Sequence, residues 1–426
     1  MLRRLSQTVG PVVSRVYNQC GGHRVRGIHT VSDYLVRQRL APIPKGNCGI
    51  IAMIGESLFE SSEALDRLAC MKHRGGIVGN GSDGVGIGIG IGPHDISERF
   101  SKYKPGMLIG QMSLPKGDRF DSFVDAMVGD AYSVPDHRYV HIDDQFRPDS
   151  DGTAPFDVVQ FLLSRKDEQP IQDTERLSLL VTSEFSISRR SSVAHLWSLA
   201  SDHLVFKSMA WPEHLRQYFC DEIPQRTNTI YGHVRMATNS EPLLRFVHPF
   251  HWGNQNNGEN NGALATRLAC ISLLKEQFPM LDLPDLSANS DSYDLGLYLT
   301  LLQLKGFQRD DVFSHVFRLP SKGLLPVSPI PDAYPPYSGP FYGIYYDNNT
   351  FLTTAGDLNV RPAFVAYDGN KTVISSEMYD PYNFHSLPTG TWRMNNVGGI
   401  ERVGFNTQPS VIAVSDLHKR GDNDAY

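Results

Sequence analysis

Apolar residues in the first quarter of the chain follow patterns that predict two strands and a helix. The apolar run at residues 50–54, within KGNCGIIAMI, is typical of a buried strand. Residues 61–73 are predicted to form an amphipathic helix, with Leu65 and Leu68 at the start of its apolar face. Gly75 is expected to end this helix. Residues 85–91 alternate between apolar side chains and glycine, which predicts a strand with one bare face that another backbone can approach closely.

The rest of the chain predicts one more strand and three more helices. A helix is expected around residues 156–164, inside an otherwise polar region, and a leucine-rich helix is expected from Asp291 to Gly306. Alternation in TIYGHVRMATNS predicts a strand with one face formed by Tyr231, His233 and Arg235. A third helix is predicted by apolar residues at helical spacing, namely Leu264, Leu268, Ile271 and Leu274.

Composition narrows the class of protein without naming a function. The chain has 426 residues and 40% hydrophobic content, which is ample for a packed core, and its apolar runs are too short for a transmembrane segment. Five scattered cysteines without a CxxC pair argue against a disulfide framework or a zinc site and fit a reducing compartment. A GxGxxG match at residues 79–84 follows a helix instead of a strand, so we reject a nucleotide site and expect neither metal nor cofactor.

Charge is distributed unevenly along the chain. Residues 1–47 contain eight basic residues and a single acid, Asp33, which resembles a mitochondrial presequence; a basic tail on a cytosolic protein is the alternative. The remaining 379 residues contain 32 basic and 45 acidic residues. This balance leaves no basic surface for nucleic acid, and we expect no nucleic-acid partner. The predicted location is the mitochondrial matrix.

Four kinds of candidate side chain suggest a chemistry when they are taken together. Each has an ordinary explanation: Cys48 as a buried inert thiol, Arg235 as a surface ion pair, Asn257-Gly258 as a turn in the loop entering a helix, and Asp291 as a helix cap. Their functional roles would be a nucleophile, a carboxylate binder, an oxyanion hole and an ammonium binder. Hydrolysis of the side-chain amide of a free amino acid needs this set, and glutamine fits it.

The sequence also resembles the class II glutamine amidotransferase domain of the N-terminal-nucleophile hydrolases, in particular the glutaminase domain of glutamate synthase. The resemblance runs collinearly from Cys48 to about residue 380, through the segments CGIIAMI, ALDRLACMKHRGG, GSDGVGI, MLIGQMSLPKGD, YGHVRMATNS, NNGENN, SDSYDLGLYLTLL and VRPAFVAYDGNKTVISSEMY. It implies an α+β fold, a four-layer αββα sandwich. The expected divisions are an N-terminal presequence, propeptide or retained extension (1–47), the amidotransferase-like domain (48–385) and a C-terminal extension (386–426).

The resemblance also implies a role for each site residue. Cys48 is the nucleophile, and its own α-amino group is the general base. Arg235, helped by Thr238, binds the α-carboxylate of glutamine, and Asp291 binds the α-ammonium group. Asn257 and Gly258 form the oxyanion hole. The α-amino base requires cleavage of the bond between Asn47 and Cys48.

Two functional hypotheses from different classes remain open. One is a glutaminase or amidotransferase subunit that passes ammonia to a protein partner. The other is a noncatalytic relative that serves as a structural subunit of a large mitochondrial complex, with the bond before Cys48 intact. The second is favoured by departures from the family pattern. Met236 replaces an aromatic residue and Asn256 replaces a histidine. The late loop before Arg361-Pro362 has the sequence GDLNV, which differs from the pattern of the family at that place. The 426 residues also contain no match to the flavin and iron–sulfur region that uses the ammonia in glutamate synthases.

Overall fold

The computed structural model describes most of the chain from Cys48 onwards. The described residues are 48–377 with gaps at 79–80, 148–153, 221, 238–240, 253, 259–262, 282–285, 287–289, 318–328, 332, 338–340, 348–349, 356–362 and 368–369, together with 393–394, 400–404 and 410–412. The expected presequence at 1–47 and the expected substrate-binding residue Thr238 lie outside them.

The largest sheet, called the first sheet here, has seven antiparallel strands with Cys48 at the start of one of them. In spatial order they are β10 (His203–Ser208), β4 (Val85–Gly90), β11 (Arg226–Val234), β1 (Gly49–Glu60), β16 (Lys371–Ser375), β15 (Phe364–Tyr367) and β17 (Arg393–Met394). The strands expected from residues 50–54, 85–91 and 229–240 are therefore confirmed as β1, β4 and β11, which are neighbours in space although distant in sequence.

A second sheet faces the first. Its strands in order are β12 (Asn254–Gly258), β13 (Phe341–Asp347), β14 (Thr350–Ala355), β18 (Ile400–Gly404) and β19 (Ser410–Ile412). Apolar side chains from both sheets form one buried cluster, in which Ile50 and Ala52 of β1 pack with Tyr342 and Ile344 of β13. The two sheets therefore share an apolar interface.

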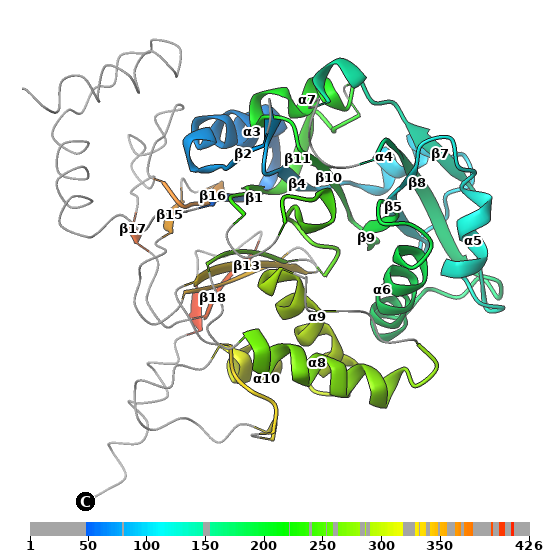
Figure 1. The fold of residues 1–426 in the computed structure, drawn as a ribbon. Coiled ribbons are helices and arrows are strands. Elements are labelled where there is room, and N and C mark those ends of the chain that lie inside the picture. Colours follow the sequence, from blue (N-terminus) through cyan, green and yellow to red (C-terminus); the bar gives the residue numbers. More distant parts are fainter. Residues whose placement is uncertain are drawn as a thin grey trace, which may run out of the picture.

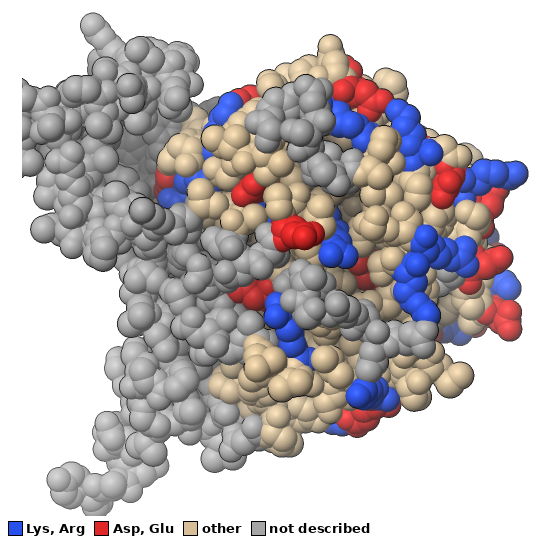
Figure 2. All heavy atoms as spheres, in the orientation of Figure 1, with Lys and Arg blue, Asp and Glu red and all other residues tan. Residues whose placement is uncertain are grey.

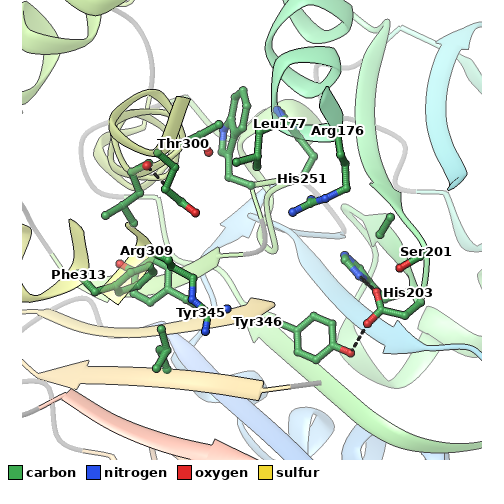
Figure 3. A pocket seen from close by; sticks show the side chains of 16 residues that line it. Arg176, Leu177, Ser201, His203, His251, Thr300, Arg309, Phe313, Tyr345 and Tyr346 are labelled. Carbon is green, nitrogen blue, oxygen red and sulfur yellow. Dashed lines mark hydrogen bonds and ion pairs between the residues drawn. The ribbon is translucent and has the colours of Figure 1, made fainter. Parts of the chain in front are cut away.

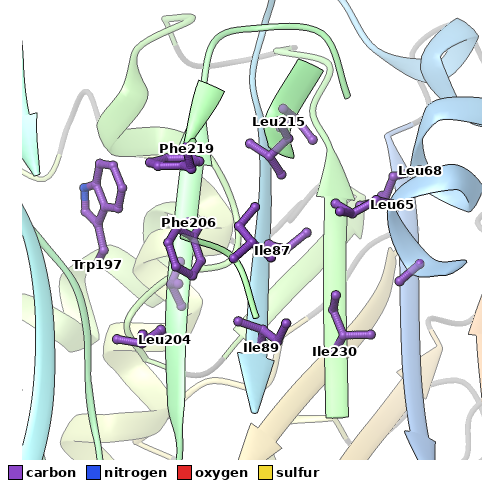
Figure 4. Close-up of a cluster of buried hydrophobic side chains, with 14 of the residues drawn as sticks. Leu65, Leu68, Ile87, Ile89, Trp197, Leu204, Phe206, Leu215, Phe219 and Ile230 are labelled. Carbon is purple, nitrogen blue, oxygen red and sulfur yellow. The ribbon is translucent and has the colours of Figure 1, made fainter. Parts of the chain in front are cut away.

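Helices cover the outer faces of both sheets, which completes four layers (Figure 1). On the first sheet, Leu65 and Leu68 of α3 (Ser61–Cys70) join the core cluster that contains Ile87 and Ile89 of β4 (Figure 4). On the second sheet lie α8 (Ala263–Gln277), α9 (Asp291–Leu304) and α10 (Arg309–Val316), whose buried side chains pack with residues of β13 and β14. The expected αββα sandwich is confirmed.

A third sheet extends the molecule beside β10. It contains β6 (Tyr132–Ser133), β8 (Phe156–Arg165), β5 (Leu108–Pro115) and β9 (His195–Ala200), with β7 (His137–Val140) pairing β8. Helices α5 (Asp121–Met127) and α6 (Asp173–Ser188) pack on it. The remaining elements are short: η1 (Lys72–Arg74), β2 (Ile77–Val78), β3 (Gly81–Ser82), α4 (Pro93–Arg99), η2 (Asp144–Phe146), η3 (Pro212–His214), α7 (Leu215–Tyr218) and η4 (Leu244–Phe246).

One expectation from the apolar pattern is wrong and another is confirmed. The segment expected as a helix around residues 156–164 is the strand β8, because it lies between β5 and β7 and its central apolar residues are buried on both faces. A short apolar run of this kind does not distinguish strand from helix. The helix predicted by Leu264, Leu268, Ile271 and Leu274 is confirmed as α8. Leu274 is buried in the core, whereas Leu264 and Leu268 are 70% and 59% exposed, so only the later part of the stripe faces the core.

The bare face of β4 is confirmed and has identifiable occupants. A Cβ atom on Gly86 would lie 2.2 Å from the carbonyl oxygen of His248, and one on Gly88 would lie 2.1 Å from the ring of Tyr231. The glycines thus let the backbone at residue 248 and an aromatic ring pack directly against the strand.

The predicted domain boundaries at residues 47 and 385 stay predictions. Three short strands, β17, β18 and β19, lie beyond residue 385 and pair with the first and second sheets.

Candidate functional site

Cys48 lies at one end of two interior strands of the first sheet, directly before β1 begins and beside the end of β11. Gly49 pairs with Val234, so Cys48 sits beside the residues that follow β11. The backbone N–H of Met236 donates to the Cys48 Sγ at 3.2 Å, and Sγ lies 3.6 Å from the carbonyl oxygen of the same residue. An N–H directed at the sulfur favours negative charge there, which is the charge that a nucleophilic thiolate carries.

Arg235 is buried next to the thiol, with 3% of the residue exposed. One terminal nitrogen donates to the carbonyl oxygen of Asp83 at 3.2 Å, and the other donates to that of Glu241 at 2.9 Å. Burial lowers the pKa of Arg235, while the negative charges of Cys48, Asp83 and Asp291 act in the opposite direction. The guanidinium is thus held by the backbone within electrostatic reach of a thiol and two carboxyl groups.

Asp83 belongs to this site, although the sequence patterns assigned it no role. Its carboxylate accepts the backbone N–H of Ala237 at 2.6 Å and is 6% exposed. A Cβ atom on Gly76 would lie only 1.8 Å from this carboxylate. Asp83 therefore fixes the segment that follows Arg235. The sequence pointed to Asp83 only through the segment GSDGVGI, which contains it and is part of the resemblance to the family.

The other predicted site residues lie on the second sheet and the helix behind it. Asp291 is in the first turn of α9, and its Oδ1 accepts the N–H of Ser292 at 2.8 Å; the cap itself is Ser290. Asn257 and Gly258 belong to β12, opposite Tyr342 and Phe341 of β13, so the loop expected there is wrong for these two residues. Strand β12 contacts both β1 and α9, which brings it between the strand of Cys48 and the helix of Asp291.

Comparison with known proteins identifies the family. A sequence profile for glutamine amidotransferases class-II matches residues 48–312, which is more than half of the chain and begins at the candidate nucleophile. This chain belongs to the class II glutamine amidotransferases. No curated protein sequence matches it.

Two solved structures are similar to this chain at low identity. One is a glutamine phosphoribosylpyrophosphate amidotransferase from B. subtilis complexed with ADP and GMP, with 11% identity and a TM-score of 0.40, covering 86% of this chain and 50% of that one. The other is described as the allosteric regulatory enzyme of purine biosynthesis, with 13% identity and a TM-score of 0.36, covering 50% of this chain and 41% of that one. The chain therefore spans half or less of the length of each.

An ion pair between Arg74 and Glu377 anchors the backbone of Cys48. The Nε of Arg74 donates to the carbonyl oxygen of Cys48 at 3.0 Å, and another of its nitrogens lies 2.9 Å from Glu377. His73 Nε2 also contacts Glu377 at 2.9 Å. Burial alone would raise the pKa of Glu377, but the hydrogen bond from His73 and the charge of Arg74 outweigh it and lower that pKa. The sequence reasoning missed this anchor because it gave Arg74 and Glu377 no separate role.

Behind Arg235, the core of the protein contains a row of buried basic side chains. The rings of His233 and His248 stack with centroids 4.0 Å apart and planes within 7°. Burial, followed by the charge of Arg235, lowers the pKa of His233 to about 3. Burial likewise lowers the pKa of His248, and it lowers that of Lys207 to about 7. Both imidazoles are therefore neutral at physiological pH.

The surface and the described side chains add two findings. On the face shown in Figure 2, basic and acidic side chains are interspersed among neutral ones. Among the described residues, no group of three or more histidine, cysteine and acidic side chains could hold a metal ion. In the same part of the chain, no helix is long and apolar enough to cross a membrane.

Proposed function

We propose that this chain catalyses the glutaminase half-reaction, in which glutamine is converted to glutamate and ammonia through a thioester on Cys48. The observation that carries the proposal is the pairing of a thiol with a buried arginine across the ends of β1 and β11. Met236 N–H points at the Cys48 sulfur at 3.2 Å, and Arg235 is fixed beside it by two backbone carbonyl oxygens.

Substrate binding follows from the charges around Arg235. A guanidinium can hold the α-carboxylate of a free amino acid through parallel hydrogen bonds, and Thr238 is proposed to assist. The carboxylate of Asp291, which lies within electrostatic reach of Arg235, is proposed to bind the α-ammonium group. A zwitterionic amino acid placed in this way extends its side-chain amide toward Cys48.

The chemical step needs the α-amino group of Cys48 as a base. A thiol has a pKa of about 8.5 and an α-amino group one of about 7.7–8.0, so the amine can accept the thiol proton near neutral pH. The thiolate attacks the amide carbon, and Asn257 and Gly258 are proposed to stabilise the oxyanion. Ammonia leaves with the transferred proton, and water then releases glutamate from the thioester. This route requires prior cleavage between Asn47 and Cys48.

The ammonia is proposed to pass to a protein partner, with the chain acting as a separate subunit in the mitochondrial matrix. The support for this location is the arginine-rich, acid-poor composition of residues 1–47.

A second candidate is a noncatalytic, amidotransferase-like structural subunit of a large mitochondrial complex. It is favoured by Met236 and Asn256, which replace an aromatic residue and a histidine of the family pattern next to the proposed carboxylate binder and oxyanion hole. In this case the nitrogen of Cys48 is an amide without basicity.

The N-terminal residue of the protein isolated from its organelle tests the two candidates against each other. The enzyme requires a chain that begins at Cys48, converts glutamine to glutamate, and loses this activity on Cys48→Ser but not on the matched change Cys70→Ser. An intact bond between residues 47 and 48 refutes the glutaminase. Recovery of the native protein as a monomer without partners refutes the structural subunit.

Arg235→Lys tests the proposed carboxylate contact in a chain that begins at Cys48. Lysine keeps the charge but loses the planar, two-bond geometry. Loss of one charge-assisted hydrogen bond corresponds to about 1.5–3 kcal/mol, so KM for glutamine should rise roughly 10- to 100-fold. An unchanged KM together with reduced kcat would place Arg235 outside the substrate-binding site.

A further inference from the structure

The first turn of α9 carries Asp291, the residue proposed above to bind the α-ammonium group of glutamine. The first turn of a helix makes fewer backbone hydrogen bonds than its middle, so its position depends on other contacts. Among the described residues, the side chain of Ser290, which caps α9, makes no capping hydrogen bond. The position of Asp291 therefore depends on how its neighbours in this turn are anchored to the rest of the fold.

Tyr293 anchors this turn to α6. The residue is buried, and its hydroxyl donates to Oε1 of Glu184 at 3.4 Å. Its ring packs edge-on against those of Phe250 and Trp252, with centroids 5.5 and 5.8 Å apart. These two aromatic residues lead into β12, which contains the proposed oxyanion hole. The Tyr293 side chain thus joins the turn of Asp291 to α6 and to the segment before β12.

Glu184 is a fixed acceptor for this hydroxyl. Its buried carboxylate accepts the backbone N–H of Leu196 on Oε2 at 2.9 Å, and its Oε1 lies 3.2 Å from Nδ1 of His195. The other ring nitrogen of His195 lies 2.8 Å from the carbonyl oxygen of Ser192. Leu196 and His195 belong to β9, so the third sheet holds the carboxylate, and turning it away would leave a buried donor unpaired.

Further along the two helices, a cavity of about 50 Å³ lies between α6 and α9 (Figure 3). Leu177 of α6 and Thr300 of α9 are in its wall, and Thr300 is two helical turns beyond Tyr293. Side chains that face a cavity lack packing atoms on that side. The contacts near the start of α9 therefore have the larger share in setting its distance from α6.

A second anchor of the same turn lies one residue beyond Tyr293. Asp294 is fully buried, and its Oδ2 accepts from Nε of Arg267 of α8 at 2.6 Å. Residues 293 and 294 thus tie the turn to two different helices, with Asp291 within electrostatic reach of Arg235.

We propose that the hydrogen bond from Tyr293 to Glu184 is a positioning contact for substrate binding, which holds the first turn of α9 so that the Asp291 carboxylate meets the α-ammonium group of glutamine. Tyr293 and Glu184 act through Asp291 and not on the substrate itself. The inference rests on the proposed function, because it concerns the same substrate site.

Steady-state hydrolysis of glutamine by a chain that begins at Cys48 tests this contact in the variant Tyr293→Phe, which loses only the hydroxyl. A contact to the ammonium group is made equally in the ground state and the transition state, so weakening it raises KM and leaves kcat unchanged. Because the hydrogen bond acts indirectly, KM should rise about three- to tenfold, less than on loss of a direct charged contact.

Tyr298→Phe is the matched control. Tyr298 also belongs to α9, and its hydroxyl donates to the carbonyl oxygen of Pro335 at 3.0 Å, but it lies two helical turns beyond Asp291. Its removal should leave KM unchanged. Urea unfolding of both variants measures the stability that each hydroxyl contributes, so that a general loss of stability is recognised.

Inhibition by L-glutamate and by glutarate shows whether the effect passes through the ammonium group. Glutarate has the two carboxylates of L-glutamate but no ammonium group, so Tyr293→Phe should raise the inhibition constant of L-glutamate and not that of glutarate. An unchanged KM in Tyr293→Phe, an equal rise of KM in Tyr298→Phe, or an equal rise of both inhibition constants overturns the inference and leaves the glutaminase in place. A wild-type chain that begins at Cys48 and does not hydrolyse glutamine overturns the proposed function and the inference together.

Discussion

Lys207 lies within β10 with only 2% of the residue exposed, and its replacement by methionine should stabilise the protein at low pH. Its ammonium group is 5.3 Å from the ring centroid of Phe250. Burial lowers the pKa of Lys207 to about 7, even though the charge of Glu184 acts in the opposite direction. The folded state therefore disfavours the charged form that the unfolded state keeps.

The size and sign of the effect follow from the two pKa values of Lys207. The folded value is about 7 and the model value for an exposed lysine is 10.5. Between these values the unfolded state binds more protons, so this group adds stability as pH rises through 7 toward 10.5 and removes it as pH falls. From pH 6 to pH 9 the contribution is about 3 kcal/mol, at about 1.4 kcal/mol per pH unit above the folded pKa.

Urea unfolding of the wild type and Lys207→Met at pH 6 and pH 9 measures this contribution. Methionine is unbranched and fills the same apolar space without a charge. The stability gained by the substitution should be larger at pH 6 than at pH 9 by about 3 kcal/mol. The exposed residue Lys102 provides the control Lys102→Met, which should show no such difference. A gain that is equal at the two pH values, or a loss at pH 6, refutes the reasoning.

Two further predictions concern a glycine of β4 and a buried carboxylate. Gly86→Ala should destabilise the fold by about 1–3 kcal/mol in urea unfolding, because its Cβ would lie 2.2 Å from the carbonyl oxygen of His248; Gly129→Ala, with no heavy atom within 4 Å, should be tolerated. Burial alone would raise the pKa of Glu184, but the charge of His251 and then the hydrogen bond and charge of His195 lower it to about 2. Glu184 should therefore contribute about 3 kcal/mol to the free energy of unfolding above pH 4.5, and this contribution is lost as pH falls toward 2. Glu184→Gln should remove this acid sensitivity. Equal dependence of stability on pH in the wild type and the variant would contradict the prediction.

Sequence patterns predicted the central strands well because the apolar residues of each strand form a run or an alternation that matches the faces it buries. The alternating glycines of β4 identified a bare face, and the structure gives its occupants. The pattern failed where an apolar run shows no clear period. Strand β8 (Phe156–Arg165) has a continuous apolar run buried on both faces, which does not distinguish strand from helix. Helix α6 (Asp173–Ser188) buries Ser183 and Glu184 among its apolar residues, so its sequence shows no simple one-sided pattern.

The candidate site could be predicted only in part, because its residues come from separate segments. Local pattern placed Arg235 at the end of a strand, and the resemblance paired it with Cys48. The contacts that hold the site depend on register and on chain crossings that no local pattern encodes. Arg74 reaches the Cys48 carbonyl from 26 positions away and binds Glu377 from 303 positions away.

The register of three strands places two uncharged imidazoles behind Arg235. Gly86 of β4 pairs with His233 on one side and with Lys207 on the other, so these residues form one row across the sheet. Since Gly86 has no side chain, the backbone of His248 lies against it and its ring stacks on His233. A proton on either imidazole would repel the guanidinium of Arg235 across a medium of low dielectric constant. Burial lowers the pKa of both, so the positive charge stays on Arg235, where a substrate carboxylate is proposed to bind.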